Sequence, residues 1–303
     1  MKTNYICTMK AFGKTSTAYR FLLLILLVLA GLTATSLLYM LILLIHSGFQ
    51  WEILTGQNQN ISLMRMLQGI QACLVFILPS LLLCKIVGES PREYLSLKPA
   101  KPMQIILATV SIWTLIPLVN TLVEWNANMH FPPSLQPIES WMRAAEDQAA
   151  TLTEQLMQSA AFSDLAANLF VVAILAGIGE ELLFRGLIQR MLGPRKSHAA
   201  VWITAFLFSA IHLQFYGFIP RLLLGVWFGY LCMWTGSIWV PIAAHITNNA
   251  LATGIAFIEA RGTNVEFLEH LGQNDMLWAS GVSIALTFLI GYTFYQKFKQ
   301  ATQ

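Results

Sequence analysis

The chain has 303 residues, of which 56% are hydrophobic and only 11% charged, and its mean hydropathy is +0.61. Ordinary soluble domains carry about a quarter charged residues, so this composition excludes a typical soluble enzyme and predicts an integral, multi-pass membrane protein. The net charge of +3 says little by itself, because in a membrane protein the placement of charge matters more than its sum. The lipid bilayer is the expected partner, and nucleic acid is not.

Apolar stretches long enough to cross about 30 Å of hydrocarbon follow one another along the chain. The first is longer than the apolar region of a cleavable signal peptide, so it is interpreted as a retained span. We expect eight membrane helices, near 21–46, 66–88, 103–123, 163–192, 198–214, 217–234, 237–257 and 277–296. The predicted fold is therefore a single all-α membrane domain over residues 1–303, built as a helix bundle.

The positions of the Lys and Arg residues test this number of spans independently. With the N-terminus in the cytoplasm, all but four of the 18 basic residues, Arg185 included, fall on the cytoplasmic side. The four on the outer side are Arg65, Arg143, Arg221 and Arg261. The positive-inside rule thus predicts that both termini are cytoplasmic. In a bacterium, the membrane would be the plasma (inner) membrane.

The longest outer segment, about 125–162, is too polar to cross the bilayer. Within it, apolar residues recur at helical intervals from Ile138 to Leu156, which predicts an amphipathic helix. Two roles are open for this helix: a solvated helix on the outer surface, or a lid over a substrate entrance.

The cysteines show neither a CxxC motif nor a paired pattern. The four cysteines are Cys7, Cys73, Cys84 and Cys232, and three of them fall in or beside apolar stretches. They are interpreted as small buried hydrophobic residues and not as metal ligands.

Two adjacent glutamates, Glu180 and Glu181, interrupt the fourth apolar stretch. An acidic residue near the centre of a membrane helix costs about 2.5–3.5 kcal/mol on insertion scales, and such residues are candidates for functional sites. Glu181 precedes Arg185 by four residues, which favours a helical ion pair. Glu180 points about 100° away and has no such partner, which suits a general acid or base.

Polar residues on two other predicted helices could meet these glutamates. His212 on the fifth helix is about as far from the connecting loop as Glu180 is, so the two should lie at similar depth. His245 and Asn249 on the seventh helix are four residues apart and share one face. The amide could hold the imidazole or donate a hydrogen bond to a developing oxyanion, or these polar residues could simply join helices by hydrogen bonds.

Taken together, these residues form three motifs in order: EExxxR, FxxxH and HxxxN. They resemble the three motifs of the CPBP family, the CAAX prenyl proteases and bacteriocin-processing enzymes that are also called the Abi family. The motif-bearing core covers about 163–257. The residues that match are Glu180, Glu181, Arg185, Phe208, His212, His245 and Asn249.

This resemblance implies an intramembrane endopeptidase that hydrolyses a peptide bond with glutamate-activated water. It implies that Glu180 is the base, that His212 orients or activates the water, and that His245 and Asn249 stabilise the oxyanion. Glu181 and Arg185 would support the helix. The expected substrate is a membrane-associated protein or peptide, and a prenylated CaaX-type protein is one alternative.

The choice between a glutamate protease and a metalloprotease stays open. His212 and His245 together with a carboxylate could bind zinc. However, the HExxH motif is absent, and a glutamate that acts as the base cannot simply be counted as a ligand as well. Two other functions are also open: a non-enzymatic immunity or scaffolding protein of the same fold, and a proton-coupled transporter, although no repeat symmetry supports the latter.

Overall fold

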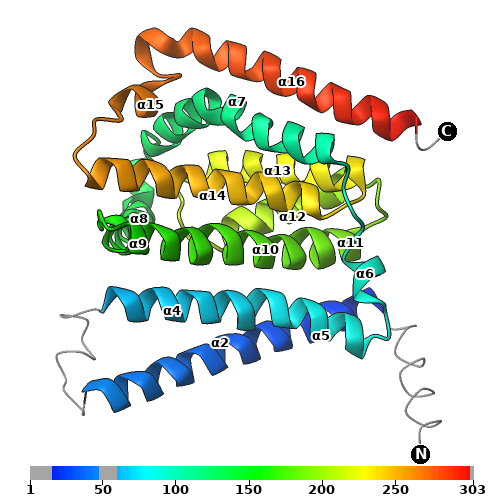
Figure 1. Cartoon of the computed structure of the whole chain (residues 1–303). Coiled ribbons are helices and arrows are strands. Elements are labelled where there is room, and N and C mark those ends of the chain that lie inside the picture. The colour runs from blue at the N-terminus through cyan, green and yellow to red at the C-terminus, as the bar shows by residue number, and fades with distance from the viewer. Residues whose placement is uncertain (1–15, 48–59, 301–303) are drawn as a thin grey trace, which may run out of the picture.

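The computed structural model describes residues 16–47 and 60–300, and all regular secondary structure in these ranges is helical (Figure 1). The longest helices are α2 (Thr17–Ser47), α7 (Pro102–Ala127), α8 (Gln136–Met157), α13 (Phe218–Thr235), α14 (Trp239–Ala260) and α16 (Leu277–Gln300). Two further stretches consist of consecutive helical pieces: α4 (Ile61–Gln71), η1 (Ala72–Ile77) and α5 (Leu78–Ile86), and then α9 (Phe162–Asn168), η3 (Leu169–Leu175), α10 (Ala176–Glu181), η4 (Leu182–Ile188) and α11 (Gln189–Leu192). The shorter elements are α6 (Pro91–Tyr94), η2 (Pro133–Leu135), α12 (His198–Ala210), α15 (Glu266–His270) and η5 (Asn274–Met276).

Each of the eight predicted spans overlaps a helical stretch, although the fifth extends past the end of its helix, and the multi-pass helical membrane fold is confirmed. Six stretches within the described ranges are long and apolar enough to cross a membrane. The fifth predicted span, α12, has only 13 residues, and the seventh, α14, is not among the six. Eight crossings with cytoplasmic termini therefore stay a prediction.

The helices lie side by side and alternate in direction (Figure 1). The pair formed by α2 and the α4–α5 stretch lies on one side of the bundle, and α7 with α16 lies on the other. Between them are the α9–α11 stretch, α12, α13 and α14. As a result, the segment that carries the two glutamates contacts α14 on one side and η1 on the other.

Basic residues gather at one end of the bundle. Near this end Tyr94 accepts a hydrogen bond from Arg20 Nη1 at 3.1 Å, and Arg190 lies over its ring at 4.2 Å. At the same end Lys196 lies over the Phe298 ring at 5.6 Å. Arg185 does not belong to this group, contrary to the prediction, because its side chain is completely buried inside the bundle.

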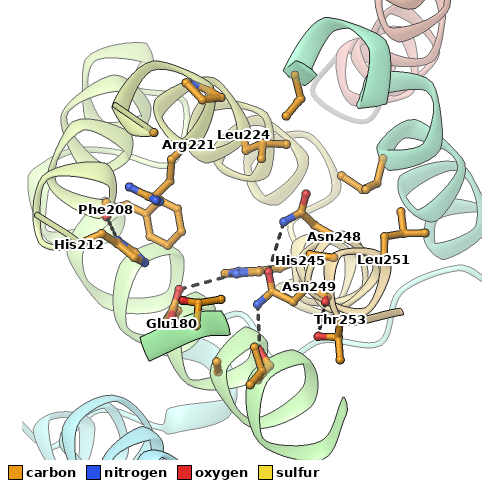
Figure 2. Close-up of a pocket in the computed structure, with 18 of the residues that line it drawn as sticks. Glu180, Phe208, His212, Arg221, Leu224, His245, Asn248, Asn249, Leu251 and Thr253 are labelled. Carbon is orange, nitrogen blue, oxygen red and sulfur yellow. Dashed lines mark hydrogen bonds and ion pairs between the residues drawn. The ribbon is translucent and has the colours of Figure 1, made fainter. Parts of the chain in front are cut away.

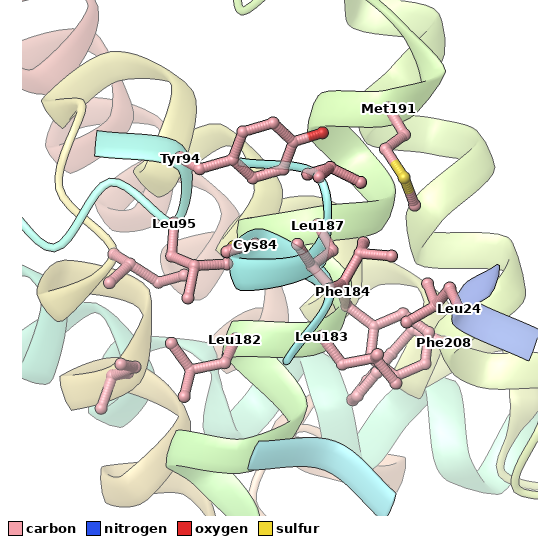
Figure 3. Close-up of a cluster of buried hydrophobic side chains, with 14 residues drawn as sticks. Leu24, Cys84, Tyr94, Leu95, Leu182, Leu183, Phe184, Leu187, Met191 and Phe208 are labelled. Carbon is pink, nitrogen blue, oxygen red and sulfur yellow. The ribbon is translucent and has the colours of Figure 1, made fainter. Parts of the chain in front are cut away.

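A buried cluster joins the glutamate-bearing stretch to the first helices (Figure 3). Leu182, Leu183 and Leu187 of η4 pack there against Leu24 of α2 and Leu95, which follows α6. Because lipid tails are as apolar as leucine, close van der Waals contact holds membrane helices together. The cluster thereby fixes the backbone that directly follows Glu181.

The cysteines only partly match their interpretation as buried residues. Cys84 and Cys232 are buried, but Cys73 is exposed on η1. A small apolar side chain is compatible with either position in a membrane protein, since lipid and protein interior are similarly apolar. Cys7 lies outside the described residues.

Candidate active site

The two glutamates lie on a very short α-helical piece. The six residues of α10 are preceded by the π-helical segment η3 and followed by the π-helical segment η4. Such π-helical turns are rare and are frequent at functional sites. The local helix is therefore wider than the regular α-helix that the spacing of the motif suggested.

Two glycines let neighbouring helices approach this piece closely. A Cβ atom on Gly177 would lie 3.0 Å from the Ile246 side chain of α14, and one on Gly179 would lie 2.9 Å from Phe76 Cβ of η1. α10 is therefore wedged between α14 and η1 in a position that larger residues would prevent. This contact places Glu180 and Glu181 next to the polar residues of α14.

Glu181 is the completely buried member of the pair. Its Oε1 atom accepts a hydrogen bond from Arg185 Nη1 at 2.7 Å and another from His245 Nδ1 at 2.8 Å. Arg185 also donates to the Gly225 carbonyl at 2.9 Å. The predicted ion pair is present, but Glu181 does more than brace its own helix: it also holds the imidazole of α14.

The His245 ring is oriented from several sides. It stacks on Phe228 with the ring centroids 5.0 Å apart and meets the edge of Phe208 at 5.8 Å. Since Nδ1 donates to Glu181, Nε2 faces the Glu180 carboxylate, with Nε2 and Oε2 3.7 Å apart (Figure 2). That distance is slightly too long for a direct hydrogen bond. Glu180 is 13% exposed and lines a cavity that Glu181 does not reach.

His212 lies beyond the end of its helix, and the predicted span 198–214 is wrong in this respect. Helix α12 ends at Ala210, and Leu213 has a left-handed backbone with φ 53°. His212 Nδ1 is 2.7 Å from the Phe208 carbonyl oxygen, one of the last carbonyls of the helix. A carbonyl only accepts, so Nδ1 carries the hydrogen and the imidazole caps the helix end. This leaves Nε2 as the ring atom available to the cavity.

Asn249 and its neighbour Asn248 form a short hydrogen-bonded chain on α14. Asn248 Nδ2 donates to Asn249 Oδ1 at 3.2 Å, and Asn249 Nδ2 donates to the Val172 carbonyl at 3.0 Å (Figure 2). Val172 belongs to η3, so Asn249 also links the two central helices. Its Nδ2 atom keeps one further hydrogen that it can donate.

These side chains surround one cavity of about 730 Å³. Glu180, His212, His245, Asn248 and Asn249 all line it, with Ile112 and Phe228 among the buried apolar residues of its wall. The predicted residues from three different helices are thus brought together. Glu181 and Arg185 lie behind the wall, as their spacing relative to Glu180 suggested.

The exposed residues of the cavity wall mark its mouth. They are Gln68, Gln71, Val123, Thr153, Ile211 and Ala252. Val123 lies in the last turns of α7 and Thr153 near the end of α8, whereas basic residues flank the beginning of α7. The mouth therefore lies toward the end of the bundle opposite the basic residues, and residues of α4, α7 and α8 contribute to its rim.

The amphipathic helix α8 borders this mouth and also holds the turn that carries His212. Trp141 packs against Phe215 with the ring centroids 5.2 Å apart, and Glu146 Oε2 accepts from the Tyr216 backbone N–H at 3.0 Å. The apolar face of α8 is only partly covered, since Ile138 and Trp141 are about half exposed. Its position supports the lid alternative by placing Thr153 on the cavity wall.

A bound metal ion is not supported by the donor set. Among the described residues, no three His, Cys, Asp or Glu side chains form a group that could hold an ion. The Nδ1 atoms of His212 and His245 are engaged by Phe208 and Glu181. Only the two Nε2 atoms and Glu180 remain, and they do not come together as a ligand set in this structure.

Arg221 is a cavity residue that the sequence analysis did not single out. It was counted only as one of the outer cations, but its side chain lines the same cavity as Glu180 (Figure 2). It is the single Lys or Arg on the described wall. The one feature of the sequence that could have indicated a role for Arg221 is its place in the first turn of a predicted membrane span.

Comparisons with known proteins agree with the motif resemblance. Residues 162–251 match a family described as type II CAAX prenyl endopeptidase Rce1-like. An uncharacterized protein, YpbD of Bacillus subtilis (strain 168), is 27% identical over 88 residues, which cover 28% of this chain and 43% of that protein. The chain thus matches less than half of the length of this relative. No solved structure matches the chain.

Proposed function

We propose that this multi-pass membrane protein, whose residues 162–251 are Rce1-like, is an intramembrane endopeptidase that uses a glutamate-activated water molecule. The observation that carries the proposal is the meeting of Glu180, His212 and His245 at one cavity within an apolar bundle. A carboxylate and two imidazoles suffice for general acid–base hydrolysis.

In the proposed reaction, a water molecule binds between Glu180 and the imidazole groups. Glu180 takes one proton from this water, and His212 Nε2 accepts a hydrogen bond that orients it. The hydroxide attacks the carbonyl carbon of the scissile peptide bond and forms a tetrahedral intermediate. Glu180 then delivers its proton to the leaving nitrogen, so that the C–N bond breaks and a carboxylic acid and an amine are released.

The negative oxygen of the intermediate needs hydrogen-bond donors fixed in advance. We assign this role to the Nε2–H group of doubly protonated His245, whose Nδ1–H is already donated to Glu181, and to the free hydrogen of Asn249 Nδ2. Glu181 supports it indirectly, because its bond to Nδ1 keeps Nε2 of His245 directed into the cavity. Loss of a single oxyanion donor typically lowers kcat about 10²–10³-fold.

The substrate proposed is a peptide segment of a membrane-associated protein, which enters the cavity through the mouth that Gln68, Val123 and Thr153 mark. A prenylated CaaX-type segment belongs to this class and provides a defined probe. The apolar wall and the position of the mouth suit a peptide that carries apolar side chains or a lipid group.

The test compares wild-type protein with Glu180→Gln, which keeps the size of the side chain but removes its basicity. Purified proteins in detergent are incubated with a farnesylated CaaX peptide, and membranes of cells that express each form are compared by proteomics. Cleavage and processing should be lost in Glu180→Gln and kept in Glu154→Gln, an exposed glutamate on α8. Full activity of Glu180→Gln would refute the assignment of the base and favour a non-enzymatic role.

A further inference from the structure

Among the described residues, one permanent positive charge lines the cavity, and the hydrolytic reaction does not explain its role. Arg221 lies in the first turn of α13, at the end of the helix where the backbone dipole is positive. A cation is unfavourable there. The residue is also partly withdrawn from solvent. A charged side chain in such a position destabilises the protein unless something binds it, and such violations concentrate at functional sites.

No carboxylate forms an ion pair with Arg221 within the described residues. Its hydrogen-bond partners are the neutral oxygens of Gln214: the backbone oxygen accepts from Nη1 at 3.4 Å, and Oε1 accepts from Nη2. Glu146 and Glu180 act on it only at longer range. Glu146 is already engaged by the Tyr216 backbone N–H.

The guanidinium is held in place by its surroundings. A Cβ atom on Gly217 would be 3.2 Å from Nη2, so the absence of a side chain there makes room for the group. Gln214 anchors one edge, and the remaining N–H groups are free to donate toward the cavity. Figure 2 shows Arg221 on the same side of the cavity as His212, across from Asn249.

We propose that Arg221 is a specificity-determining residue that binds a carboxylate of the peptide substrate close to the scissile bond. The planar, forked guanidinium matches a carboxylate with two parallel hydrogen bonds, and an apolar cavity strengthens such a contact. The carboxylate is either the free C-terminus of a short leaving segment or an Asp or Glu side chain beside the cleaved bond. This inference rests on the proposed peptidase function.

The test uses two pairs of farnesylated CaaX peptides. The first pair differs only in a free C-terminal carboxylate against a C-terminal carboxamide. The second pair consists of carboxamides that carry Asp or Asn directly after the farnesylated cysteine, beside the bond to be cleaved. Wild-type protein should prefer the acidic member of at least one pair by about 10- to 100-fold in kcat/KM, as expected for a charge-assisted contact. The pair that shows the preference identifies the source of the carboxylate.

Arg221→Gln should abolish this preference, so that the ratio of the two kcat/KM values falls to about 1. The substitution should raise KM for the acidic peptide and leave KM for the neutral peptide nearly unchanged. Arg221→Lys should keep part of the preference, because the charge remains but the fork is lost. The matched control is Arg261→Gln, which removes a cation near the same end of the bundle but outside the cavity. Absence of any acid preference in wild-type protein, or an equal loss on acidic and neutral peptides, would overturn the inference.

A binding measurement distinguishes failure of the proposed peptidase function from failure of the carboxylate site. If wild-type protein cleaves none of the peptides, their binding to it in detergent is measured by fluorescence polarisation. An acid preference in binding that depends on Arg221 would support the carboxylate site without proteolysis. Equal binding of all four peptides would overturn the site.

Discussion

Glu181 Oε1 accepts hydrogen bonds from Arg185 Nη1 at 2.7 Å and from His245 Nδ1 at 2.8 Å, so one buried oxygen joins an arginine of its own helix to an imidazole of α14. Its other oxygen has no hydrogen-bond partner among the residues that the structure describes. The whole arrangement depends on this one atom, since it neutralises a buried cation and orients a cavity side chain at the same time. Arg185 further lies 4.7 Å from the Phe208 ring centroid, which connects it to the second histidine.

Removal of Glu181 should therefore affect both stability and function. In Glu181→Ala the Arg185 cation stays buried without its partner, which typically costs about 3–5 kcal/mol. We expect a clear loss of thermal stability in detergent, measured by intrinsic fluorescence on heating. The double variant Glu181→Leu/Arg185→Met removes both charges and should recover much of the stability. Peptide cleavage should stay low in the double variant, because His245 has lost its orienting acceptor; recovery of cleavage would mean that Glu181 only braces the helix.

Phe208 should matter for the positions of both histidines. Its ring contacts those of His212 at 5.2 Å and His245 at 5.8 Å, and it is almost completely buried. Removal of a buried phenylalanine typically costs about 3–5 kcal/mol, so Phe208→Ala should lower the unfolding temperature. The Phe208→Leu variant should fold but have a lower kcat, because leucine lacks the flat ring that lies between the imidazoles of His212 and His245. The matched control is Phe206→Leu on the exposed face of α12, and equal kcat values for the two leucine variants would contradict the prediction.

Gly179 should tolerate no side chain. Its Cβ position lies 2.9 Å from Phe76 Cβ and 3.3 Å from the Ala72 carbonyl oxygen. Gly179→Ala should push α10 away from η1 and destabilise the protein by about 1–3 kcal/mol, as is typical of overpacking. The change is measured as a shift in thermal unfolding, together with the activity. Gly254→Ala on α14, where nothing lies within 4 Å, should be neutral or slightly stabilising; a similar loss in both variants would contradict the close contact.

The loop before α8 should stay fixed down to strongly acidic pH. Hydrogen bonds from Arg143 and from the Phe131 backbone N–H lower the pKa of Glu139 to about 2. Because the folded-state pKa is depressed, the stabilising contribution is present above the ordinary value near 4.5 and is lost as pH falls through about 2. Pepsin digestion should thus spare residues 128–143 at pH 4 and cleave them near pH 2. Glu139→Gln should be cleaved at both pH values, and protection of this variant at pH 4 would contradict the prediction.

The mouth of the cavity should face away from the cytoplasm if the positive-inside rule holds. Thr153 lies at the mouth, and Lys98 lies at the basic end. Each position is changed to cysteine in a background without the natural cysteines, and intact cells are treated with a membrane-impermeant maleimide. Thr153→Cys should react and Lys98→Cys should react only after the cells are opened. The reverse pattern would mean that the cavity opens to the cytoplasm.

Local and periodic features of the chain were predictable because they depend on residues close in sequence. The lengths of the apolar stretches predicted the helical bundle, and the four-residue spacing predicted the pair of Glu181 and Arg185. The same spacing separated Glu180, which faces the cavity, from Glu181, which does not. The placement of His212 at the depth of Glu180 followed from simple helix geometry, even though the residue lies beyond its helix end.

Contacts between distant segments were decided only by the tertiary structure. The π-helical segments on either side of α10, the bond from His245 to Glu181 and the place of Arg221 on the cavity wall all depend on which helices touch and how closely. Apolar periodicity carries no such information in a membrane, where lipid and helix neighbours are similarly apolar. The sequence by itself determined that two glutamates with different partners lie inside a helical bundle. The tertiary structure decided that the paired one also holds His245, while the other faces the cavity that Arg221 lines.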